Sequence, residues 1–205
     1  MAGLLLDATR MDAIQPVPPP AAAAVRRFTC RLEPHGPRGH LLRVAGALYA
    51  GWAGRLAAEL ARNRITIHRV RALRSPSMIW EAQLELEALP GGADPETLDL
   101  AVLLADRRDP PRAPAPVLTA ARVRPGPGAA TVEIHAEDAV GFLERVLGTF
   151  AFFSLFPCEL RVETRGRHVV DVFRLQGLGG RPPTATALRG LEARLAELCG
   201  TPVAP

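Results

Sequence analysis

Two kinds of apolar spacing alternate along the chain, and they predict strands and helices in a repeated order. Between residues 131 and 137, Val132, Ile134 and Ala136 alternate with polar side chains, which is typical of a half-buried strand. After Gly141 the spacing changes to the 3.6-residue period of a helix with one buried face. The apolar positions of this helix are Phe142, Leu143, Val146, Leu147, Phe150 and Phe153.

Two further alternating stretches follow, joined by a short turn. Residues 158–164 and 168–176 each alternate in polarity, and the sequence RGR between them predicts a β-hairpin. A closing helix is expected next, with one apolar face formed by Leu188, Leu191, Leu195 and Leu198. The second half of the chain is therefore expected to contain a strand, a helix, two strands and a helix.

The first half repeats this order more loosely and adds a fourth strand. Its expected elements are a strand over 26–33, a helix over 39–63, a hairpin over 65–73 and 78–88, a helix over 94–106 and a strand over 116–124. The second half has only residues 201–205 left for its own fourth strand. That strand must be very short, absent, or supplied by another segment such as 3–8.

The predicted fold is α+β, with two ferredoxin-like βαββαβ domains in tandem and helices on one face of antiparallel sheets. Proline-rich stretches at 107–116 and 124–128 separate the two copies. The predicted organisation is an N-terminal tail over 1–24, a first domain over 25–125 and a second domain over 129–205.

Charge and motif content argue against several classes of function. The net charge is +4 and the pI is near 9.7. However, Arg69 and Arg71 face Glu81, Gln83, Glu85 and Glu87 across the first hairpin, which predicts ion pairs rather than a polyanion-binding surface. An RNA-binding domain of the same strand order would need stacking aromatics where Arg167 and Val169 stand. We therefore expect no nucleic-acid partner.

Metal, membrane and catalytic signals are also weak. The three cysteines are far apart and no Cys/His ligand cluster occurs, so no metal site and no cofactor are expected. No apolar run approaches the ~18 residues that span a bilayer, and no signal peptide is evident, so a cytoplasmic protein without a membrane partner is expected. Neither a Ser/His/Asp constellation nor a phosphate-binding glycine loop is present, which argues against an enzyme.

Residues 130–198 resemble an ACT domain, and the closest similarity is to the paired ACT domains that end bacterial uridylyltransferases acting on the PII protein. Stand-alone tandem ACT regulators have a similar length and two-copy layout. The resemblance rests on a glycine loop, the end of a hairpin and a turn, matched by Asp138, Gly141, Phe142 and Leu143, by Asp171 and Phe173, and by Gly180, Arg181 and Pro182. In the first half Gly39, Leu41 and Leu42 fit the loop and Glu81 stands near the hairpin aspartate. The spacing there is about twelve residues longer, and we assign the extra residues to the helix over 39–63.

The resemblance implies a regulatory module that binds an amino acid or a similar small effector, forms a homo-oligomer and acts on a protein partner. A glycine turn at a helix start leaves backbone N–H groups for a carboxylate, and a nearby acid can hold an ammonium group. The candidate ligand-binding residues are Asp138, Ala139, Val140, Gly141 and Phe142, together with Gly36, Gly39 and His40 of the first copy. Two alternatives remain open: Asp138 caps the helix, or the protein is a ligand-free scaffold that pairs through its sheet edges.

Overall fold

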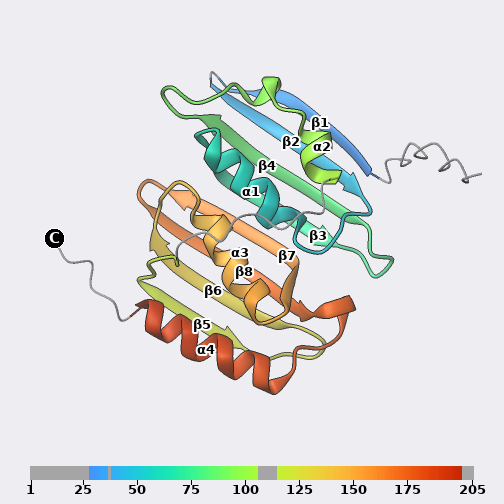
Figure 1. Cartoon of the computed structure of the whole chain (residues 1–205), viewed down its shortest axis with the longest axis vertical. Helices are drawn as coiled ribbons and strands as arrows, with labels where there is room; N and C mark the ends of the chain where they lie inside the picture. Colours follow the sequence, from blue (N-terminus) through green and yellow to red (C-terminus); the bar gives the residue numbers. More distant parts are fainter. Residues whose placement is uncertain (1–27, 37, 106–114, 200–205) are drawn as a thin grey trace, which may run out of the picture.

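The computed structural model describes residues 28–36, 38–105 and 115–199, which form an α+β protein with one antiparallel sheet of eight strands. Figure 1 shows the strands in the order β1-β2-β4-β3-β7-β8-β6-β5. The strands are β1 (Phe28–His35), β2 (Gly39–Gly46), β3 (Ile65–Arg74), β4 (Trp80–Ala88), β5 (Ala120–Arg124), β6 (Ala130–Glu137), β7 (Leu155–Arg165) and β8 (His168–Gly177). The α-helices in the described residues are α1 (Trp52–Arg62), α2 (Leu100–Ala105), α3 (Phe142–Phe152) and α4 (Ala185–Cys199).

The two halves of the chain repeat the same order, strand-strand-helix-strand-strand-helix. Their sheet positions mirror each other about the central β3–β7 pair, in which Arg71 lies opposite Arg161. Residue numbers differ by 90 between equivalent positions of α1 and α3 and of β3 and β7. The β-bulges at Ile67/Arg69 and Pro157/Glu159 agree with this offset, as do the left-handed residues Arg64 and Ser154 that follow the helices.

The expectation of one long helix over residues 39–63 is wrong in its first part. Residues 39–46 form β2, in which Leu42 and Val44 are buried while Arg43 between them is exposed. This alternation has the period of a strand, and pairing with both β1 and β4 satisfies the backbone of β2. The small residues after β2 made the change from strand period to helix period hard to recognise in the sequence. In the structure α1 begins only at Trp52.

The strand expected over 116–124 was predicted to be the fourth strand of the first copy, and this assignment is wrong. It forms β5 over Ala120–Arg124 and pairs with β6 of the second half. In the first half the corresponding edge position is taken by β1, which pairs with β2. Each half therefore begins, rather than ends, with its edge strand. The segments 1–24, 3–8 and 201–205 lie outside the described residues.

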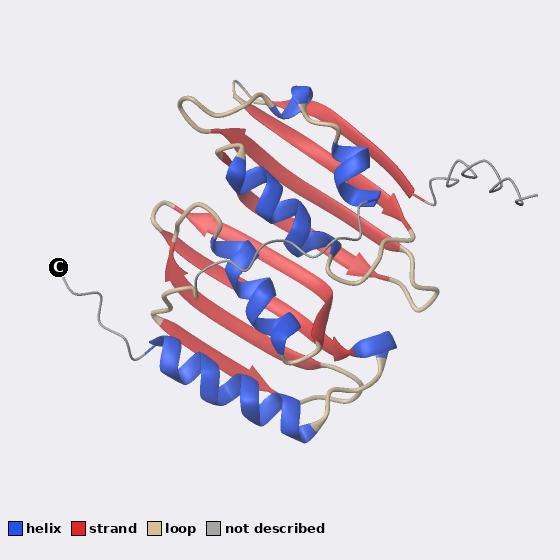
Figure 2. Ribbon diagram, viewed as in Figure 1, coloured by secondary structure: helices blue, strands red, loops and turns tan. Residues whose placement is uncertain are grey.

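Helices α1 and α3 pack side by side on one face of the sheet, and α4 lies along β5 (Figures 1 and 2). Beneath them the core contains two edge-to-face aromatic pairs, Trp52 with Trp80 and Phe150 with Phe173. The helices run antiparallel and close together, since a Cβ on Gly54 would lie 3.4 Å from Leu147 Cβ. Cavities lie toward both ends of this helix pair.

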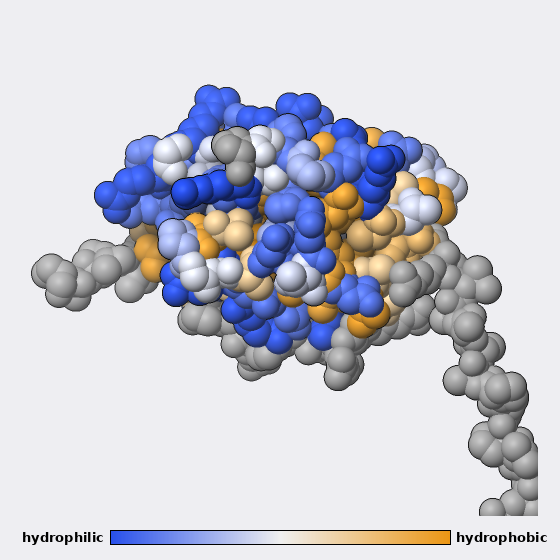
Figure 3. All heavy atoms as spheres, turned by 90° about the horizontal axis from the view of Figure 1, so that it is seen from above, coloured by the Kyte–Doolittle hydropathy of each residue, from blue (hydrophilic) through white to orange (hydrophobic). Residues whose placement is uncertain are grey.

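Charged side chains populate the other face of the sheet, as the hairpin pattern predicts. Arg69 of β3 pairs with Glu85 of β4 at 3.1 Å and with Glu163 of β7 at 3.6 Å, so it joins the two halves. The view along the sheet in Figure 3 shows hydrophilic residues over much of the surface around an apolar band. Such exposed pairs contribute up to about 1 kcal/mol each. Among the described residues, no helix is both long and apolar enough to cross a membrane.

Candidate functional site

A small cavity lies between the two halves, where the loop before α3 meets the end of α1. We call it the Gly141 cavity; its volume is about 30 Å³. Loop residues 138–142 line it together with Ala57 and Ala61 of α1, the first residues of β3, and parts of β7 and β8. A volume of this size holds a water molecule or a group of similar size such as an ammonium.

The predicted loop residues Asp138, Ala139, Val140, Gly141 and Phe142 all line this cavity. Gly141 adopts the left-handed conformation, with a φ of 78°, which a glycine accommodates without strain. The amide of Phe142 donates to the carbonyl of Ala139 at 2.9 Å and closes the turn. The structure thus brings together the five candidates of the second half.

The side chain of Arg145 holds this loop in place. Its guanidinium donates to the carbonyl of Val140 at 2.8 Å and to the carbonyl of Gly141 at 3.2 Å. These bonds give both carbonyl groups a charged donor. They therefore hold the loop in one conformation without a ligand. Arg55 occupies the equivalent position at the start of α1, 90 residues earlier.

Asp138 does not cap α3. The N-cap residue is Gly141, and no side chain accepts a hydrogen bond at this helix end. The carboxylate of Asp138 is exposed at the cavity instead, while its own amide donates to the carbonyl of Arg167 at 2.9 Å. The capping alternative for Asp138 is therefore wrong.

The most unusual group in the cavity wall is the carboxyl of Asp171, on the inward face of β8. Asp171 is fully buried, and neither oxygen of its carboxyl has a hydrogen-bond partner among the described residues. Its neighbours in the lining include the apolar side chains Ile65, Val162 and Val169. Buried polar groups are usually paired, and an unpaired one costs about 1–3 kcal/mol or more.

Burial raises the pKa of Asp171 to about 8, since the ionised form loses its hydration. The nearby carboxylate of Asp138 raises this pKa further, while the backbone N–H of Glu163 opposes the shift. No hydrogen bond of normal geometry joins that amide to the carboxyl, so both carboxyl oxygens remain without a partner among the described residues. Without a bound cation Asp171 is therefore mostly protonated at neutral pH.

A third acid, Glu144 of α3, also lines the cavity, and burial raises its pKa while Arg62 and Arg145 lower it. The lining thus holds Asp138, Glu144 and Asp171 and no arginine or histidine. Three acids in one small cavity favour a cationic group there. The described residues contain no cluster of three or more His, Cys, Asp or Glu side chains arranged to hold a metal ion.

The candidates of the first half lie elsewhere. Gly36 is in the β1–β2 turn, and Gly39 and His40 begin β2. His40 lies 3.4 Å from Glu96 and 3.8 Å from Asp94, at the outer end of the first half. None of the three lines the Gly141 cavity.

The residue that corresponds to Gly141 is Gly51. Gly51 precedes α1, has a φ of 91° and lacks a capping side chain, as does Gly141 before α3. Counted from Gly51, the first half therefore has no extra residues, because β2 and its connection to Gly51 correspond to β6 and its connection to Gly141. The 90-residue offset between α1 and α3 also leads from Gly141 to Gly51 in the sequence.

Comparison with known proteins gives no further guide. No protein-family model matches the chain, and a search of curated proteins finds no relative. The functional argument therefore rests on the geometry of the described residues.

Asp171 is the site residue that the sequence-based candidate set omits. The signal was present, because Asp171 lies between Val169 and Phe173 on the apolar side of an alternating strand. A single acid at such a position predicts a buried carboxyl. In the first half Glu81 is not its counterpart; Glu81 is exposed, and Ala82 points inward.

Proposed function

We propose that this protein is a non-catalytic regulatory module that binds a small amine, in the simplest case an amino acid, at the Gly141 cavity. The observation that carries the proposal is the fully buried, unpaired carboxyl of Asp171 in the cavity wall. An ammonium group is a donor of the right size and charge for a cavity of about 30 Å³.

The loop supplies the complement for the other end of an amino acid. The first N–H groups of α3 have no acceptor within the helix, and the helix dipole favours an anion there. Gly141 leaves room for a ligand to approach the backbone. A ligand that places its ammonium at Asp171 and its carboxylate at this helix start would give a partner to the Asp171 carboxyl and to the first N–H groups of α3.

The resemblance to tandem ACT domains supports the same proposal. Each half then corresponds to a ferredoxin-like unit in which the first strand, β1 or β5, fills the position of the usual last strand. The cavity lies between the halves, so a bound ligand would couple their relative positions. Such coupling is what a cytoplasmic regulator of a partner protein requires.

The proposal is tested by thermal unfolding with each of the twenty amino acids and with the N-acetyl form of every one that binds. A ligand at ~100 times its dissociation constant should stabilise the fold by ~2.7 kcal/mol. The acetylated forms should not bind, because they lack the ammonium group. Asp171→Asn should abolish the effect of the amino acid, whereas equal binding of the acetylated form would refute the proposal.

A second candidate function, a ligand-free scaffold, is favoured by one observation. Strand β1 is an edge of the sheet, and β2 is its one hydrogen-bonded neighbour among the described strands. Its free edge can add a strand from another copy of the chain. No response to any amino acid, together with a concentration-dependent dimer in light scattering, would favour this function.

A further inference from the structure

The repeat places a second site at Gly51, and its chemistry is opposite to that of the Gly141 cavity. A groove of about 850 Å³ lies at the other end of the α1–α3 pair. We call it the Gly51 groove; it is bounded by residues 49–55, by residues along α3 from its first turn to its end, and by the start of β7. Applying the 90-residue offset to the Gly141 loop, residues 138–142, gives 48–52, which largely overlaps this wall.

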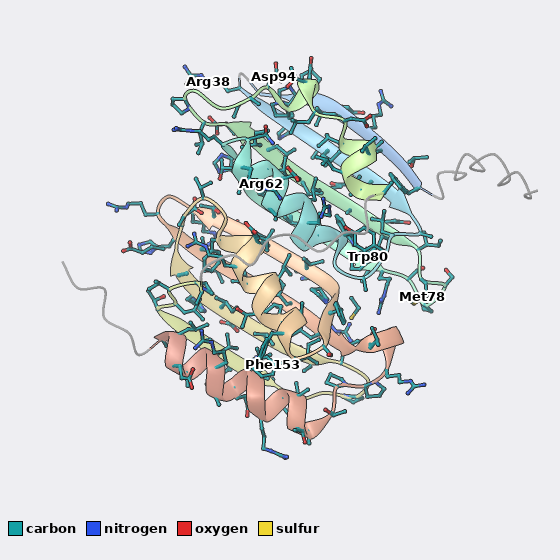
Figure 4. All side chains as sticks on the ribbon, viewed as in Figure 1. Arg38, Arg62, Met78, Trp80, Asp94 and Phe153 are labelled. Atoms are coloured by element: carbon teal, nitrogen blue, oxygen red, sulfur yellow. The ribbon has the colours of Figure 1, made fainter. Side chains whose placement is uncertain are left out.

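Aromatic and aliphatic side chains form most of the groove. Trp52 and Trp80 lie edge to face with ring centroids 5.4 Å apart and are almost fully buried. Phe152 lines the groove and is 73% exposed, so its ring is available to a ligand there. Figure 4 shows Trp80 and Arg62 toward opposite ends of α1, which separates this groove from the Gly141 cavity.

The charge of the groove is positive. Its lining includes Arg55, Arg74, Arg145 and Arg194, against a single acid, Glu144. The guanidinium of Arg74 donates to Gln176 and lies 5.8 Å from the centre of the Trp80 ring. Where Asp171 stands in the second half, the first half has Ala82, so the repeat does not bring a carboxyl to this end of the helix pair.

Two groups in the groove wall require an acceptor. The indole N–H of Trp52 is buried and has no acceptor among the described residues, although Trp52 itself lines the groove. The start of α1 has neither a capping side chain nor an acid in its first turn. An unpaired buried donor and an uncapped helix start both favour an anionic oxygen.

From this geometry we infer that the Gly51 groove is a second ligand site, which binds an aromatic carboxylate. The ring occupies the apolar part beside Phe152 and Trp80, and the carboxylate accepts from Trp52 Nε1. This volume and mixture of apolar surface with a few polar groups is that of a small-molecule site. The inference goes beyond the proposed function and rests on different residues, so either can fail without the other.

The test uses three probes of nearly equal size: phenylacetate, 2-phenylethanol and phenethylamine. Trp52 and Trp80 are the two tryptophans of the chain, so intrinsic fluorescence reports directly on the groove. Phenylacetate should change this fluorescence with a saturable curve at millimolar concentration. The neutral alcohol should bind about 10-fold more weakly or not at all, and the amine should not compete.

Two variants locate the site by calorimetry. Trp52→Phe keeps an aromatic ring but removes the N–H donor, and it should weaken phenylacetate binding about 10-fold. Phe152→Ser changes an exposed side chain, so it should leave the fold intact and also weaken binding. Val102→Ser, which changes an exposed apolar side chain of α2 outside the groove, is the matched control and should bind phenylacetate as the wild type does. Equal binding of phenethylamine, or unchanged binding in both groove variants, would overturn the inference.

Discussion

Asp171 of β8 occupies the position in the second half that Ala82 of β4 occupies in the first. Asp171 pairs with Ile134 of β6, and Ala82 pairs with Val44 of β2. The partners Ile134 and Val44 differ by 90 in residue number, and Asp171 and Ala82 differ by 89. Both side chains are buried beneath the helix layer. A repeated fold therefore tolerates an apolar residue at this position, and the carboxyl in the second half is not needed to build it.

The carboxyl of Asp171 should make the stability of the protein depend on pH. The folded state keeps this proton up to a pKa of about 8, whereas the unfolded chain releases it near 3.8. The contribution of this group to the free energy of unfolding should therefore be most favourable below about pH 4, fall as pH rises to 8, and then level off. The total loss is on the order of 5 kcal/mol.

Asp171→Asn should remove this dependence. Denaturant unfolding at pH 5 and pH 8 should show similar stability for wild type and variant at the lower pH and a more stable variant at the higher pH. Asp138→Asn, at an exposed position of the same cavity, is the control and should retain most of the pH dependence. A wild-type stability that does not fall between these pH values would contradict the assignment of a raised pKa.

Gly141→Leu should eliminate amine binding while leaving a folded protein. The left-handed backbone makes any side chain there cost roughly 1–2 kcal/mol. A Cβ at Gly141 would lie 3.6 Å from Ala61 Cβ, so the fold can accept it, but the remaining leucine atoms add to the cavity wall. Gly128→Leu is the matched control, with a φ of 74° and open space around it. Both variants should be destabilised alike, and the control alone should still bind.

Gly190→Ala should disturb the contact between α4 and Phe153, which Figure 4 labels. A Cβ at Gly190 would lie 2.7 Å from the Phe153 ring, so the ring must move, at a cost of roughly 1–3 kcal/mol. Gly148→Ala makes the same change in α3, where nothing lies within 4 Å. That variant should gain up to about 1 kcal/mol from helix propensity. If thermal unfolding showed that both substitutions change the stability in the same direction, that result would contradict this account of the packing.

Amine binding at Asp171 should strengthen with pH below 8. An ammonium group pairs with the ionised carboxyl, so binding releases the proton that Asp171 holds in the free protein. The dissociation constant should fall by up to about tenfold for each pH unit between 6 and 8. Calorimetry in buffers of different ionisation enthalpy should detect close to one proton released per ligand at pH 6. Binding independent of pH, with no proton release, would exclude Asp171 as the ammonium partner.

The second half could be predicted from sequence in most of its elements because its periods are clear. The alternation over 131–137 and the helical face after Gly141 correspond to β6 and α3. The first half was harder because alanine and glycine dominate residues 45–54, and such residues carry little information on period. The strand β2 was therefore merged with α1, and Gly39 was chosen where Gly51 stands.

The partner of each strand in the sheet was outside the reach of local patterns. The sequence of β5 predicts a strand, but only the assembled sheet shows that β6 is its partner. The same is true of the site: the loop residues around Gly141 follow from the motif, whereas the cavity depends on the contact between α1 and α3. The inward position of Asp171 was readable from alternation, but its lack of a partner was not.

The most direct test is to measure the pKa of Asp171 by a pH titration monitored through the ¹³C NMR signal of its carboxyl carbon. The titration is made on the free protein and again with the amino acid that gives the largest thermal shift. The account predicts a midpoint near pH 8 without ligand and a marked fall in that pKa at saturation, because the ammonium group stabilises the ionised form. A midpoint near 4 in the free protein, or one that does not move when the ligand saturates, would contradict it.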